Sequence, residues 1–146
     1  MRKIYLVLVT ILLCGSGLFA QTPQDQAQIL QLCVDLPELQ KNYPVGIEGD
    51  TAAVYIMQYP IVIPTDIAIS KFGKKPVFMT RHEIYDNNVE AFFLFKNLDI
   101  LESSARVDLS MYYDYNSAEQ KVFHIALDFQ KENEEWVVGS YEIERK

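Results

Sequence analysis

The C-terminal half of the chain alternates between large apolar and polar residues, which is the pattern of half-buried β-strands. The segment VFHIALDF, residues 122–129, is the clearest case, because every second position is large and apolar. The alternation predicts a meander of strands at 77–85, 90–96, 105–115, 121–130 and 135–144. The four connections between these five strands are rich in turn-forming or charged residues. Their sequences are DNN, KNLDILESS, NSAEQ and KENEE.

Helical signals precede this region. Thr22 is suited to cap a helix, with Pro23 at its first position and Asp25 in its first turn. The apolar residues that follow recur at helical spacing, namely Ile29, Leu30, Cys33 and Val34. Pro37 breaks this pattern and is expected to start a short second helix that ends before Pro44.

The most apolar stretch after the N-terminus covers residues 51–69, between the turn sequences GIEGD and KFGKKP. Its first part, 52–59, is predicted to be a strand with both faces partly covered. Pro60 and Pro64 cannot donate hydrogen bonds to a neighbouring strand, so 60–66 is expected to be an edge, a bulge or a crossing segment.

The order of these elements, helices first and then a run of strands, predicts an α+β fold. We expect one or two N-terminal helices packed on a curved, mainly antiparallel sheet of about five or six strands. Residues 21–146 contain no internal repeat, low-complexity tract or linker and are expected to form one domain.

The first 20 residues have the layout of a secretory signal peptide. Arg2 and Lys3 precede the apolar residues 4–13, and small residues follow up to Ala20, after which cleavage is expected. The sequence therefore predicts a bacterial protein exported to the periplasm or the cell exterior.

Two alternatives to a cleaved signal peptide stay open. One is an uncleaved membrane anchor, although ten apolar residues are short for a bilayer span. The other is a lipid anchor at Cys14, which the bulk of Leu13 disfavours.

Charge narrows the classes of partner. The whole chain has 13 basic and 20 acidic residues; without Arg2 and Lys3 the basic residues fall to 11 and the net charge from −7 to −9. Nucleic acids and anionic membrane surfaces are therefore disfavoured, because both are bound through basic residues. After cleavage only Cys33 of the two cysteines remains, so no intrachain disulfide is expected and a buried, inert thiol is predicted.

His124 is the first candidate for chemistry. In the register that keeps the large apolar residues on one face, His124 lies opposite Tyr112 on one neighbouring strand and opposite Glu142 on the other. These three residues are the candidate catalytic set, with His124 as general base and Glu142 orienting it. The preferred interpretation is a ladder of polar residues on the solvent face of the sheet.

Other chemical motifs are missing from the sequence. His82 and Glu83 are expected on opposite faces of a strand, and Asp86 stands where the zinc motif H-E-x-x-H requires histidine. There is no G-x-S-x-G elbow and no glycine-rich phosphate loop. No metal and no cofactor are therefore expected.

Aromatic residues gather in the predicted strands, at Phe92, Phe93, Phe95, Tyr112, Tyr113, Tyr115 and Trp136. Filling of the core is the first interpretation. A shallow apolar or aromatic pocket between a helix and the curved sheet is the second.

The segments ARVDLSMYYDYN and KVFHIALDFQKENEEWVVGSYEIE combine alternating strands, a long hairpin, a charged turn and a tryptophan. In this the chain resembles the C-terminal half of NTF2-like (SnoaL-like) α+β domains and small secreted bacterial proteins of unknown function. The resemblance covers about 40 residues from Ala105 on and implies a curved sheet facing a helix. It carries over no catalytic residue, and the N-terminal half departs from the family, whose opening helices are usually longer.

The function favoured by these features is that of an exported, non-enzymatic domain that binds a small ligand or a protein partner. One alternative is an acidic inhibitor or immunity-like protein, which would present the loop DILESS to a basic enzyme. Another is an NTF2-like enzyme with a pocket that contains His124, Tyr112 and Glu142.

Overall fold

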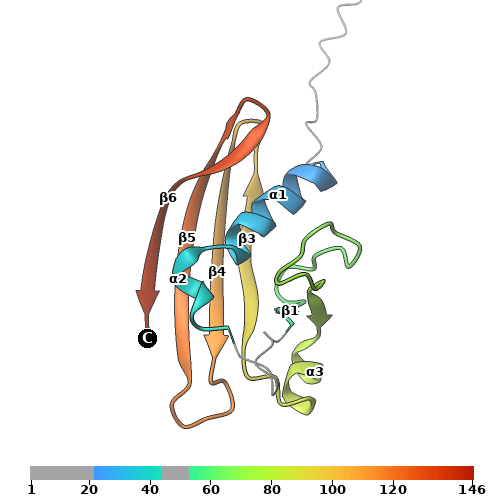
Figure 1. Cartoon of the computed structure of the whole chain (residues 1–146), viewed down its shortest axis with the longest axis vertical. Helices are drawn as coiled ribbons and strands as arrows, with labels where there is room; N and C mark the ends of the chain where they lie inside the picture. The colour runs from blue at the N-terminus through green and yellow to red at the C-terminus, as the bar shows by residue number, and fades with distance from the viewer. Residues whose placement is uncertain (1–21, 44–52) are drawn as a thin grey trace, which may run out of the picture.

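The computed structural model describes residues 22–43 and 53–146. The predicted signal peptide, its cleavage site, Cys14 and the predicted turn at 46–50 lie outside the described residues. Within them the chain forms three helices and six strands (Figure 1). Their bounds are α1 Pro23–Val34, α2 Pro37–Gln40, β1 Tyr55–Met57, β2 Val77–Met79, α3 Arg81–Asp86, β3 Phe92–Ile100, β4 Ser104–Tyr113, β5 Lys121–Glu132 and β6 Glu135–Arg145.

The six strands form one sheet in the order β2-β1-β3-β4-β5-β6. The strands from β3 to β6 are a meander of antiparallel neighbours, and β1 is parallel to both β2 and β3. The prediction of an α+β fold with a mainly antiparallel sheet is therefore confirmed. At the other end from β2, the long strand β6 forms an edge of the sheet (Figure 1).

Helix α1 begins as its sequence predicts. The hydroxyl of Thr22 accepts a hydrogen bond from the backbone N–H of Asp25 at 3.0 Å, and Pro23 is the first helical residue. This cap satisfies one of the N–H groups that have no partner within a helix. The short helix α2 begins at Pro37, as expected.

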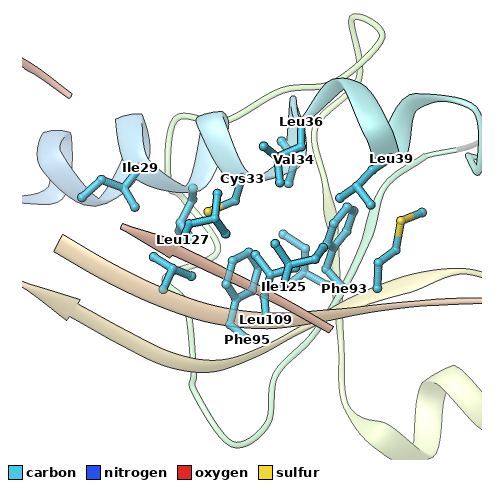
Figure 2. Packing of buried hydrophobic residues seen from close by; sticks show 14 of the residues in the cluster. Ile29, Cys33, Val34, Leu36, Leu39, Phe93, Phe95, Leu109, Ile125 and Leu127 are labelled. Atoms are coloured by element: carbon cyan, nitrogen blue, oxygen red, sulfur yellow. The ribbon is translucent and has the colours of Figure 1, made fainter. Parts of the chain in front are cut away.

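The main core lies between α1, α2 and one face of the sheet. Figure 2 shows side chains of the two helices pointing toward those of β3, β4 and β5. The labelled residues of this interface are all buried, namely Ile29, Cys33, Val34, Leu36, Leu39, Phe93, Phe95, Leu109, Ile125 and Leu127. The prediction that Cys33 is buried is confirmed, and burial raises the pKa of its thiol far above the ordinary value.

The predicted strand at 77–85 is wrong beyond Met79. Residues Arg81–Asp86 form helix α3, which starts with a capping box. The Thr80 hydroxyl accepts from the N–H of Glu83 at 3.3 Å, and the Glu83 carboxylate accepts from the N–H of Thr80 at 2.7 Å. The T-x-x-E sequence is the signal for such a box, and it outweighs an alternation of only a few residues.

The strand predicted at 52–59 is also shorter than expected, because β1 covers only Tyr55–Met57 among the described residues. In contrast, β3 continues to Ile100 through most of the predicted connection KNLDILESS. The pairing with β4 shifts at Lys96, because a β-bulge lies between Phe95 and Asn97. The bulge returns the later apolar residues of β3, Leu98 and Ile100, to the core face of the sheet. The turn that remains is short, and the Leu101 N–H bonds the Ser104 carbonyl at 2.8 Å.

No helix of the described residues is both long and apolar enough to cross a bilayer.

Candidate functional site

The predicted neighbours of His124 are wrong by two residues on each side. His124 pairs with Ser110 on β4 and with Glu144 on β6, where Tyr112 and Glu142 were expected. A shift of two residues keeps every side chain on its predicted face, so the division between core and solvent faces is correct.

The turns and a bulge account for this shift. On β5 and β6, Glu132 pairs with Glu135 across a turn of Asn133 and Glu134, whose φ angles are 50° and 68°. Farther along β6 the pairing shifts again at Gly139, because β6 has an extra residue there. Alternation of apolar residues specifies neither feature.

His124 lies on the face of the sheet away from α1 and α2, where its Nδ1 atom has two neighbours. It is 2.8 Å from the hydroxyl oxygen of Ser110 and 3.0 Å from the Nζ of Lys96. An ammonium group only donates hydrogen bonds, so Nδ1 accepts and the neutral imidazole carries its proton on Nε2.

The surroundings of His124 favour this neutral form. Burial lowers the pKa of His124, and the positive charges of Lys96 and Lys146 lower it further. The carboxylate of Glu144 acts in the opposite direction but does not reverse the shift. The imidazole is therefore mainly neutral at pH 7.

The candidate catalytic residues are only partly brought together. His124 and Glu142 line one hollow of about 500 Å³, together with Lys96, Asp108 and Glu144. Tyr112 does not line this hollow; its ring stacks on that of Phe92 with centroids 4.9 Å apart.

Ser110 gives the hollow no nucleophile. Its hydroxyl bonds His124, which is the contact that activates serine in many hydrolases. Ser110 is nevertheless 0 % exposed, so a substrate in the hollow would not reach its oxygen. The hydroxyl therefore satisfies a buried polar group and holds the imidazole ring.

A titration checks the charge state of His124. We expect its pKa below the usual value near 6.5, and we expect Lys96→Met to raise it, because the substitution removes a positive charge beside the ring. Proton–nitrogen NMR spectra of the imidazole rings, recorded against pH, measure the pKa of His124 in the wild type and in Lys96→Met. The His82→Gln variant shows which signals belong to which histidine. Lys41→Met, on the other face, is the control; a wild-type pKa above 6.5 would contradict the described contacts.

A larger hollow, which we call the α1 groove, runs along helix α1. It has a volume of about 1060 Å³. Its lining comes from α1, from the segment 64–68 in the loop between β1 and β2, and from the start of β6. Its lining residues are Pro23, Gln24, Gln26, Ala27, Gln28, Gln31, Leu32, Pro64, Asp66, Ile67, Ala68, Glu135 and Trp136.

Hydrogen bonds fix the distance between the two walls. The Gln31 side chain donates to the Ser70 carbonyl at 2.8 Å and accepts from the Ser70 N–H at 2.9 Å. Beside this clamp, Lys71 forms a salt bridge with Asp35 at the end of α1. The groove is therefore held open by contacts within the chain before any ligand arrives.

Asp25, in the first turn of α1, holds the lining residue Trp136 in place. Its carboxylate accepts from the indole N–H of Trp136 at 2.7 Å and from the ammonium group of Lys131 at 2.8 Å. Thr22 adds a third hydrogen bond to this carboxylate at 2.6 Å. Hydrogen bonds from Lys131, Thr22 and Trp136 lower the pKa of Asp25 to about 2.

The aromatic residues divide between several places, and only Trp136 of the predicted set lines the α1 groove. Phe93, Phe95 and Tyr113 belong to the main core. Phe92, Tyr112 and Tyr115 pack together with α3 on the other face of the sheet. The predicted pocket between helix and sheet is thus mostly filled, and the groove lies beside the helix.

Sequence reasoning missed the other residues of the groove, although α1 carries one signal. Gln24, Gln28 and Gln31 recur at intervals of four and three, which places them on one side of the helix. A stripe of uncharged amides is unusual beside a solvent-facing surface, where charged residues are common.

The part of the chain that the structure describes contains no group of three or more His, Cys, Asp and Glu side chains placed to hold a metal ion. His82 instead lies 3.1 Å from Asp86, one turn later on the exposed side of α3.

Comparison with protein-family models, curated proteins and solved structures finds no match to this chain. No ligand or residue role is therefore available from a relative. Any function assigned to the chain rests on its own groove and on the polar face of its sheet.

Proposed function

We propose that this protein is an exported, non-enzymatic domain that binds a small ligand or a segment of a protein partner in the α1 groove. The proposal rests on the α1 groove, whose two walls are joined by the hydrogen bonds between Gln31 and Ser70. A preformed concave surface with apolar residues and a few polar groups is the usual form of a binding site. A fixed site also loses little conformational entropy on binding.

The hollow around His124 gives weaker support to the enzyme alternative. Its imidazole accepts hydrogen bonds through Nδ1 from groups of the chain itself, and its nearest hydroxyl is buried. Tyr112 faces other aromatic rings. The NTF2-like relationship stays a proposal supported by the hydrophobic pattern of residues 105–144, and it supplies no residue to this hollow.

The acidic-inhibitor alternative relied on an exposed loop DILESS. In the structure Asp99 and Ile100 belong to β3, and Glu102 is the acidic residue left in the turn. This turn offers little charge for binding a basic enzyme. The acidic groups of the α1 groove are better placed for such contact.

Filling the groove tests the proposal. Ala68 is exposed and lines the groove, so Ala68→Phe is expected to narrow it at little cost in stability. Proton–nitrogen NMR spectra with a library of soluble fragments are expected to show shifts concentrated on α1 and 64–68, and the substitution is expected to remove them. Ala118→Phe, in the exposed turn between β4 and β5, is the matched control.

The same spectra separate the alternatives. Shifts concentrated on Lys96, His124 and Glu142 would contradict the groove proposal and favour the enzyme. Fragment shifts that survive Ala68→Phe unchanged would also contradict it.

Export is supported by the N-terminal pattern of Arg2, Lys3 and the apolar residues 4–13. N-terminal sequencing of the secreted protein is expected to start at Gln21. A lipid-modified start at Cys14 would show the anchored alternative.

A further inference from the structure

We infer that the α1 groove binds an extended, basic peptide segment of a partner protein. This inference rests on the proposed function and specifies the chemistry of the ligand. Three features of the groove carry it: the sign of its charges, its unused amide groups and its length.

The charges of the groove all have one sign. Asp66 and Glu135 are the only charged residues that line it, and both are exposed. Neither forms a salt bridge with a basic side chain among the described residues. The two carboxylates come from different parts of the site, one from the loop wall and one from the start of β6, so a basic segment lying in the groove would meet negative charge at either place.

The whole molecule has the same sign. The chain has a formal net charge of −7, with 20 acidic and 13 basic residues. A field of this sign steers basic partners toward the protein and repels acidic ones. The local and the overall charge thus favour the same class of ligand.

The amides of α1 favour a peptide over a compact cation. Gln24 and Gln26 form no side-chain hydrogen bond within the described part of the chain. Gln28 uses its carbonyl oxygen toward the N–H of Trp136, at 3.4 Å, which leaves its amide N–H groups free. Side-chain amides both donate and accept, and Gln24 and Gln28 lie one turn apart on one side of α1, so this pair can bond the N–H and C=O groups of an extended backbone.

The apolar residues and the length fit the same ligand. Leu32 and Ile67 are half-buried and provide contact for apolar side chains beside a basic one. The lining part of α1, residues 23–32, is about 15 Å long at 1.5 Å per residue. An extended peptide rises about 3.3 Å per residue, so the groove accommodates about four residues.

Selection from a random heptapeptide library displayed on phage tests the inference with the intact protein. The expected result is enrichment of sequences with one Lys or Arg flanked by apolar residues. Recovery should be lost on Ala68→Phe and retained on Ala118→Phe. Enrichment without a basic residue, or equal recovery on Ala68→Phe, overturns the inference.

A synthetic peptide of the enriched sequence then measures the charge effect. Trp136 is the only tryptophan of the chain and lines the groove, so its fluorescence reports binding. The arginine peptide is expected to bind about tenfold more tightly than its citrulline analogue, which is neutral and similar in shape. Asp66→Asn combined with Glu135→Gln should abolish this ratio, whereas Glu119→Gln, outside the groove, should preserve it.

The outcomes separate the inference from the proposed function. Equal affinity of the arginine and citrulline peptides, or tighter binding of spermidine than of the peptide, overturns the basic-peptide inference while the groove remains a binding site. Fragments and peptides that all fail to bind at the groove overturn both.

Discussion

Replacing Leu127 with alanine is expected to lower the free energy of unfolding by about 2–5 kcal/mol. Leu127 is 0 % exposed, and it lies between β5 and the helices in the middle of the main core (Figure 2). The substitution removes apolar contacts and leaves a cavity that rigid strands on both sides do not close. Urea unfolding followed by circular dichroism measures the loss.

Glu132→Ala is the matched control, because Glu132 is exposed at the end of the same strand. Its effect is expected to stay within about 0.5 kcal/mol. Similar losses for the two variants would mean that the apolar face of β5 does not pack on the helices.

The Asp25→Asn variant is expected to be less stable by about 2 kcal/mol at pH 7. The charged carboxylate binds Lys131 and Trp136, and these contacts lower its pKa from 3.8 to about 2 in the folded protein. A lowered carboxyl pKa adds stability above the pKa of the unfolded chain. The added stability is lost as the pH falls from about 4 to about 2.

The difference in the free energy of unfolding between wild type and Asp25→Asn should therefore shrink as the pH falls from about 4 to about 2. Urea unfolding at pH 7, pH 4 and pH 2 measures it. Asp99→Asn is the control, since Asp99 is exposed and forms no salt bridge within the described residues. A difference that stays constant from pH 7 to pH 2 would show that Asp25 acts through packing and not through its charge.

The start of α1 and the faces of the long strands were predictable because local rules determine them. Thr22 and Pro23 have the side chains that a helix start requires. In β5 the alternation from Phe123 to Phe129 divides core from solvent whichever strand lies beside it.

The register was not predictable from alternation, since a shift of two residues satisfies the same pattern. The turn of Asn133 and Glu134 and the extra residue at Gly139 select the pairing of His124 with Glu144. Pairing thus decides which side chains surround His124, and the predicted trio with Tyr112 and Glu142 depended on it.

Helix α3 was missed for another reason. Residues 81–86 give fewer than two turns of helix, too few for a helical period to appear, and the segment was therefore assigned to a strand. The capping pair Thr80 and Glu83 was the usable signal.

The α1 groove depends on contacts between distant parts of the sequence. Gln31 binds Ser70 across 39 residues, and Trp136 reaches Asp25 across 111. Neither contact leaves a mark in local periodicity, so the walls of the groove follow only from the tertiary fold.

The position of β6 at the edge of the sheet has a consequence for behaviour in concentrated solution. An edge strand of this length offers backbone hydrogen-bonding groups to a second molecule, which is how aggregation by strand addition begins. The bulge at Gly139 interrupts the flat edge, and Glu142 and Glu144 place negative charge along it. Colloidal stability therefore depends on side chains that contribute little to folding, and neutral β-branched residues at both positions would leave the fold intact but make the protein prone to aggregate.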